Sequence, residues 1–70
     1  MDIRRRVGLN VAKYRRKKGL SQEALAFDCK IHRTYISGVE RGVRNPTIVV
    51  LAKIARQLGV SPGQLLDDGR

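Results

Sequence analysis

The sequence predicts an all-α fold, a compact bundle of five short helices, and three observations lead to this prediction. Apolar residues recur at helical spacing in the longer segments. Glycine or a helix-capping residue separates each segment from the next. No stretch alternates between apolar and polar residues for long enough to suggest a strand. Because a chain of 70 residues supports only a small core, we expect a single domain over residues 1–70.

The first helix is expected from about residue 3 to 18, because Val7, Val11 and Tyr14 recur there at helical spacing. Cations fill its last turn, where they suit the negative end of a helix. Gly19 follows and supplies the C-terminal stop.

Two further short helices are expected, joined by a tight turn. Ser21 is a good N-cap for the second helix, which ends near Cys29. The third helix runs from about Arg33 to Arg41 and stops at Gly42.

The last two helices carry the strongest capping signals. The fourth is capped by Thr47, or by Asn45 with Pro46 at its first position, and it ends before Gly59. The fifth is a single short piece, for which residues 61–64 (SPGQ) offer a capping box with proline at the favoured first position. The apolar residues expected to fill the core face of the fourth helix are Ile48, Leu51, Ala55 and Leu58.

The composition is strongly basic. The chain has 15 Lys and Arg against 6 Asp and Glu, which gives a net charge of +9. Such a charge on a small domain indicates a polyanionic partner. A basic surface without a ligand is the alternative, and charge alone does not decide between the two.

Several classes of protein are disfavoured. Cys29 is the single cysteine, so no internal disulfide can form, and we expect a buried, inert thiol. No apolar run approaches the roughly 18 residues of a membrane span, and the basic N-terminus lacks the apolar segment of a secretion signal. We therefore expect a cytoplasmic protein. The sequence offers no nucleophile–base pair, metal cluster or phosphate-cradling glycine loop, which argues against an enzyme, a metal site or a cofactor.

The third helix has two unlike sides when it is placed on a helical wheel. Ile36 and Val39 share one side, Thr34 and Ser37 lie roughly opposite with Arg41, and Arg33 falls at the edge. An α-helix fits the DNA major groove, where a helix held by its apolar side can offer its polar side to base edges. An ordinary solvated face would also fit this pattern.

Three segments, LSQEALA at 20–26, RTYISGVERG at 33–42 and RNPT at 44–47, resemble the helix-turn-helix family of phage repressors and Cro. The similarity extends from about residue 7 to 66. The stretch from 33 to 45 is especially similar to the small controller proteins of restriction–modification operons. The resemblance implies a helix-turn-helix domain that binds double-stranded DNA as a sequence-specific transcriptional regulator.

The resemblance also implies roles for individual residues, with base readout at the start of the third helix and phosphate contacts around it. The residues expected to read base edges are His32, Arg33, Thr34 and Ser37. The residues expected to contact phosphates are Gln22, Tyr35, Arg41, Arg44 and Asn45. For three of them the alternatives stay open: Gln22 facing solvent, His32 as a plain surface histidine, and Tyr35 packed against the second helix.

Three positions depart from the family pattern. His32 takes the N-cap place where serine or threonine is common, and histidine caps poorly. Lys30 stands in the turn where the family usually has glycine with positive φ. Gly38 removes a side chain that reads bases in some relatives, and its small size could let the helix approach DNA closely.

The resemblance further implies an ion pair between Arg15 and Glu40, which ties the first helix to the end of the third. Glu40 lies on the flank of the inward side of its helix, so we expect a largely buried pair whose role is orientation.

A single recognition helix covers only a few base pairs, and the family forms two-fold dimers on half-sites about one helical turn apart. The fourth helix has more apolar residues than one core face requires. The expected homodimer interface comprises Val49, Val50, Val60, Leu65 and Leu66. The alternative is that Leu65 and Leu66 merely close the monomer core.

Two other functions are alternatives to a regulator. One is an antitoxin or accessory subunit whose main partner is another protein; the chain offers no disordered toxin-wrapping tail. The other is a membrane-active cationic helix, which the capped helices and internal glycines disfavour. No ligand-sensing domain fits in the chain, so a small-molecule effector is not expected.

Overall fold

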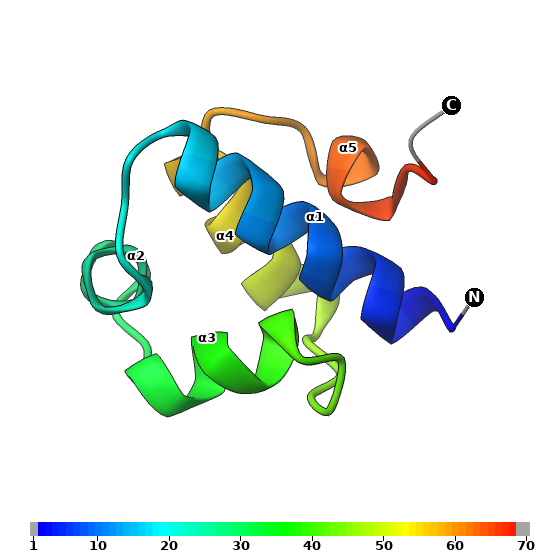
Figure 1. The fold of residues 1–70 in the computed structure, drawn as a ribbon, viewed down its shortest axis with the longest axis horizontal. Helices are drawn as coiled ribbons and strands as arrows, with labels where there is room; N and C mark the ends of the chain where they lie inside the picture. The colour runs from blue at the N-terminus through cyan, green and yellow to red at the C-terminus, as the bar shows by residue number, and fades with distance from the viewer. Residues whose placement is uncertain (1, 69–70) are drawn as a thin grey trace.

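The structure is a computed structural model that describes residues 2–68, and it confirms the predicted all-α fold (Figure 1). None of its helices combines the length and apolar character needed to cross a bilayer, within the residues described. The five helices are α1 (Ile3–Lys17), α2 (Gln22–Cys29), α3 (Arg33–Glu40), α4 (Ile48–Leu58) and α5 (Pro62–Leu66).

Side-chain caps define where most of the helices begin. The hydroxyls of Ser21, Thr47 and Ser61 each accept a hydrogen bond from a backbone N–H of the following first turn. Thr47, and not Asn45, therefore caps α4, and the capping box at Ser61 is present. His32, at the N-cap of α3, makes no side-chain cap hydrogen bond. The start of α3 consequently depends on tertiary packing more than the other helix starts do.

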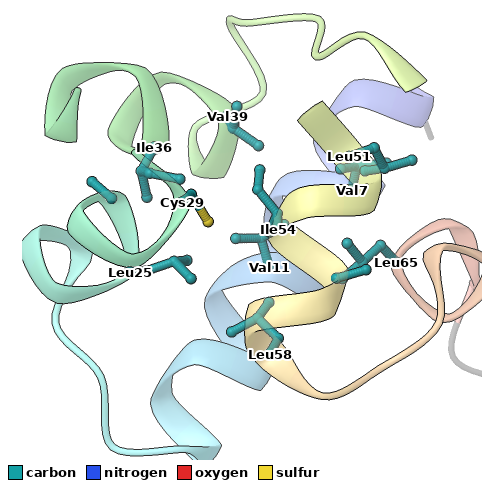
Figure 2. Packing of buried hydrophobic residues seen from close by; sticks show 12 residues of the cluster. Val7, Val11, Leu25, Cys29, Ile36, Val39, Leu51, Ile54, Leu58 and Leu65 are labelled. Atoms are coloured by element: carbon teal, nitrogen blue, oxygen red, sulfur yellow. The ribbon is translucent and has the colours of Figure 1, made fainter. Parts of the chain in front are cut away.

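The core is a single cluster to which all five helices contribute (Figure 2). α3 packs against both α1 and α2, while α5 lies against α1 and α4. Burial of Cys29 in this cluster raises the pKa of its thiol, which favours the protonated form. The fully buried large side chains are Val11, Leu25, Ile36, Val39, Ile54 and Leu65.

The core face of α4 differs from the prediction at two residues. Ile48 was expected in the core but is 84% exposed, whereas Ile54, which was not expected there, is fully buried. Leu51, Ile54 and Leu58 follow one another at intervals of three and four residues, so this line faces the core. Ile48 is the first residue of α4 and lies at the edge of that line. A helical wheel with several apolar candidates does not resolve this choice.

The turn between α2 and α3 contains a residue with positive φ. Lys30 adopts the left-handed conformation, with φ 58° and ψ 42°, as the family pattern predicts. Its backbone N–H donates to the carbonyl of Phe27, and the N–H of Ile31 donates to the carbonyl of Ala26. These bonds close α2 and start the chain toward α3.

Candidate nucleic-acid interface

α3 presents one side to the core and the other to solvent. The side chains of Ile36 and Val39 are fully buried, and Figure 2 shows both directed into the cluster. Arg33 and Thr34 are exposed, and Ser37 is half-buried. The surface of α3 therefore combines a guanidinium and two hydroxyls on a helix that is anchored from behind.

The side chain of His32, at the N-terminal end of α3, is exposed and makes no cap hydrogen bond to the helix. The backbone of His32 still starts the helix, because its carbonyl accepts from the N–H groups of Tyr35 and Ile36. His32 and Tyr35 line one shallow hollow with Ile31 and Val50. Both predicted contact residues thus lie at the same corner of the molecule, beside the start of α3.

Gly38 has a different surrounding from the one expected. It is buried, and a Cβ atom added there would lie 2.5 Å from Cγ of Arg44. The carbonyl of Gly38 also accepts from the backbone N–H groups of Val43 and Arg44, at 3.0 and 3.2 Å. The space left by the missing side chain is therefore filled by the stem of Arg44, and it is not an open approach for DNA.

This packing places the Arg44 side chain along α3. Its guanidinium carbon lies 5.9 Å from the centre of the Tyr35 ring, within the range of a cation–π interaction. Arg44 remains exposed, as do Arg41 and Asn45 in the same stretch after α3. Two exposed arginines consequently flank the C-terminal half of α3, on the loop that leads to α4.

Arg15 of α1 forms an ion pair with Glu40, the last residue of α3. Nε of Arg15 donates to Oε2 of Glu40 at 2.6 Å, and Nη2 donates to Oε1 at 3.0 Å. The two side chains are only 11% and 7% exposed. The hydrogen bonds to Glu40 raise the pKa of Arg15 above its usual value despite the opposing effect of burial. A third bond, from Nη1 of Arg15 to the carbonyl of Leu20 at 2.8 Å, ties the pair to the α1–α2 loop.

Gln22 joins the same cluster, which sequence reasoning missed. Its Nε2 donates to Oε1 of Glu40 at 3.0 Å. Gln22 is half-buried as the first residue of α2, where Ser21 caps the helix through the N–H of Ala24. The side chain expected to reach a phosphate is thus held by the carboxylate of α3. The two residues are far apart in sequence, so no local pattern signals this bond.

Gly8 is a second residue that sequence reasoning missed. A Cβ atom at Gly8 would lie 2.3 Å from the carbonyl oxygen of Val39 and 2.6 Å from that of Glu40. α1 therefore rests directly on the C-terminal end of α3. The signal was available, since glycine inside a helix costs about 1 kcal/mol relative to alanine and its presence there indicates close packing.

The predicted dimer residues differ in how far they are exposed. Val49 and Leu66 are 67% and 42% exposed, but Val50 and Val60 are partly buried against the core. Leu65 is fully buried, so it closes the monomer core and is removed from the predicted interface. It is held there because α5 packs against α1, where Nδ2 of Asn10 donates to the carbonyl of Leu65 at 2.9 Å.

Exposed apolar residues also line a depression that includes Leu66, one of the predicted dimer residues. The depression has a volume of about 180 Å³ and lies between the start of α1, the start of α4 and α5. Three of its lining residues, Ile3, Ile48 and Leu66, are 49%, 84% and 42% exposed. We call these three residues the apolar patch. Asn45 also lines the depression, so the patch adjoins the basic loop after α3.

Comparisons with known proteins agree with this geometry. The helix-turn-helix family HTH_3 matches residues 11–65. The control protein C.BamHI of Bacillus amyloliquefaciens is 55% identical over 51 residues, which cover 73% of this chain and 63% of that protein. The restriction–modification controller protein C.AhdI of Aeromonas hydrophila has a similar structure, with a TM-score of 0.85, 42% identity and coverage of 89% of this chain and 94% of its own. The biofilm regulator SinR, solved in complex with DNA, has a TM-score of 0.83 and 37% identity, with coverage of 87% and 98%.

Proposed function

The chain belongs to the helix-turn-helix family HTH_3, and we propose that it is a sequence-specific regulator of transcription whose α3 reads double-stranded DNA in the major groove. One observation carries this proposal: Ile36 and Val39 are fully buried, while Arg33 and Thr34 on the same helix are exposed. An anchored helix with groove-sized donors on its free side is what major-groove recognition requires.

Base readout falls to the first turns of α3. The Arg33 guanidinium can donate two hydrogen bonds to O6 and N7 of guanine. Thr34 can offer its hydroxyl to a base edge or its methyl group to thymine, and the Ser37 hydroxyl suits either kind of edge. His32 directly precedes Arg33, and its ring makes no cap hydrogen bond to the helix.

Phosphate contacts surround this reading surface. Arg41, Arg44 and Asn45 are exposed on the loop after α3, and Tyr35 supports the Arg44 guanidinium. Gln22 lies at the start of α2, where backbone N–H groups and the helix dipole favour an anion. The net charge of +9 adds attraction that weakens as salt is raised.

We further propose that the protein acts as a homodimer on a two-fold operator, through the apolar patch. Ile48 is 84% exposed, which leaves a large aliphatic side chain in water unless a second copy covers it. Because the patch adjoins the loop with Asn45, a dimer formed there would hold two basic loops in a fixed relation. The likeness to C.AhdI makes a restriction–modification operon the first place to seek the operator.

The test of DNA reading is selection of bound duplexes from a random pool. We expect an enriched sequence with two-fold symmetry and half-sites about one helical turn apart. Recovery of a pool without sequence preference would contradict the proposal, because charge alone would then account for binding.

The test of the dimer uses sedimentation of Ile48→Glu, with Phe27→Glu as its control. Ile48 and Phe27 are both 84% exposed, but Phe27 lies on α2, outside the apolar patch. Ile48→Glu should weaken dimerisation by roughly tenfold or more, since it buries a charge in an apolar interface, and Phe27→Glu should not. Monomer alone at high micromolar concentration, with and without the selected duplex, would contradict a homodimer.

A further inference from the structure

We propose that Glu40 is a positioning residue for DNA binding, which holds the side-chain amide of Gln22 at the place where a DNA phosphate docks. The inference rests on the proposed function, since it concerns how that interface is prepared before DNA arrives. It assigns to Glu40 a role beyond its pairing with Arg15, and it makes the start of α2 depend on the end of α3.

The geometry of the Glu40 carboxylate is the first step. Its Oε1 accepts from Nη2 of Arg15 and from Nε2 of Gln22, both at 3.0 Å, and its Oε2 accepts from Nε of Arg15 at 2.6 Å. A carboxylate has about four acceptor positions, and three are used within the protein. The Glu40 side chain is only 7% exposed, so its hydrogen bonds are made to other residues of the protein and not to DNA.

The chemistry of the Gln22 amide is the second step. An amide nitrogen carries two hydrogens, and only one is given to Glu40. Gln22 is half-buried, so part of the residue is open to solvent. The second N–H is left for an acceptor outside the chain, and a phosphate oxygen is an acceptor of the right kind. Because Glu40 already fixes the amide, less side-chain freedom is lost when the phosphate binds.

The charge of the cluster is the third step. A bare carboxylate next to the amide would repel an approaching phosphate. Arg15 removes this obstacle, because its guanidinium neutralises Glu40 through two hydrogen bonds and is itself 11% exposed. The Arg15–Glu40 pair therefore joins α1 to α3 and also lowers the repulsion that a phosphate would meet near the Gln22 amide.

A double-mutant cycle separates this role from a purely structural one. The variants are Gln22→Ala, the apolar replacement Arg15→Met/Glu40→Leu, and all three changes together, each checked for folding by thermal unfolding. The probe is the duplex enriched by the unaltered chain in the selection, titrated at one salt concentration. Gln22→Ala should weaken binding roughly tenfold to a hundredfold, as expected for a hydrogen bond to a charged group. The apolar replacement should weaken it roughly threefold to tenfold, the effect of ordering one glutamine side chain.

The decisive result is the combination. When Gln22→Ala is already present, the apolar replacement should cause no further loss of affinity. In an Arg44→Ala background, which removes a proposed phosphate contact outside the cluster, the apolar replacement should cause its full loss. Equal losses with and without Gln22→Ala would overturn the inference and leave the proposed function intact. Absence of duplex binding by the unaltered chain would instead overturn the proposed function, and the inference with it.

A second measurement needs no substitution and so does not depend on how the variants fold. The two Nε2 protons of Gln22 give separate amide resonances. These two protons differ in any glutamine, because rotation about the amide C–N bond is restricted. We expect the proton bonded to Glu40 to lie away from the position of a solvated glutamine already in the free protein, and we expect the other proton to shift when the selected duplex is added. Two resonances at the positions of a solvated glutamine, neither of which responds to the duplex, would contradict the inference.

Discussion

The two ends of α3 are built in opposite ways. At the C-terminal end, Glu40 is bonded to α1 and α2, and Gly8 lets α1 rest on the last carbonyls. At the N-terminal end, His32 makes no cap, and Arg33 is exposed. One end of the helix is fixed by side-chain and backbone contacts with α1 and α2, while the other begins without a side-chain cap. The contrast predicts that the largest losses of stability follow single substitutions at the fixed end, and that the largest changes in base preference follow substitutions at the free end.

The largest effect is expected at Glu40. Glu40→Ala leaves the Arg15 guanidinium buried without its carboxylate, so it should lower the free energy of unfolding by about 3–5 kcal/mol. Arg15→Met/Glu40→Leu, which removes both charges, should be nearly neutral by comparison. Denaturant titration measures both. If Glu40→Ala were as stable as the parent, the pair would have no anchoring role.

A smaller effect at the same end is expected for Gly8→Ala. The new Cβ would lie 2.3 Å from the carbonyl oxygen of Val39, so α1 and α3 must separate, at a cost of about 1–3 kcal/mol in unfolding free energy. Gly63→Ala is the matched control, because its Cβ meets only Oγ of Ser61 at 3.7 Å. Thermal unfolding should show Gly63→Ala unchanged or slightly stabilised. Equal behaviour of the two variants would mean that the contact of α1 with α3 is not tight.

At the free end, Arg33→Ala should leave stability within about 0.5 kcal/mol and affect binding instead. It should cost about 1–3 kcal/mol on the selected duplex and relax preference at one base position. Arg56→Ala, which removes the same charge from an exposed place on α4, is the control for net charge. Equal losses on selected and random duplex would exclude Arg33 from base readout.

The smallest effect is expected for His32→Ser, which adds the missing cap. It should raise the free energy of unfolding by about 0.5–1 kcal/mol, because serine can accept from a backbone N–H of the first turn. If His32 reads a base, the same change should also alter the selected sequence. A variant with unchanged stability would indicate that the start of α3 is already held by packing.

What the sequence could predict depends on the range of each signal. The order of the helices and the buried side of α3 follow from local patterns and were predicted correctly. The caps were predicted only in part, since α4 had two candidate caps and the capping of α1 by Asp2 was not predicted. The sequence did not show that Ile54 and Leu65 are buried or that Ile48 is exposed. Burial of an apolar residue depends on which neighbouring element covers it. The Gln22–Glu40 bond and the packing of Arg44 over Gly38 need the folded arrangement, because they join different elements.

The central claim, that the free side of α3 reads the major groove, is tested most directly by methylation interference on the selected duplex. Guanine N7 lies in the major groove and adenine N3 in the minor groove. The account predicts that methylation of guanine N7 blocks binding at positions in two half-sites about one helical turn apart. Binding that tolerates methylation at every guanine N7, and is blocked only at adenine N3, would contradict it.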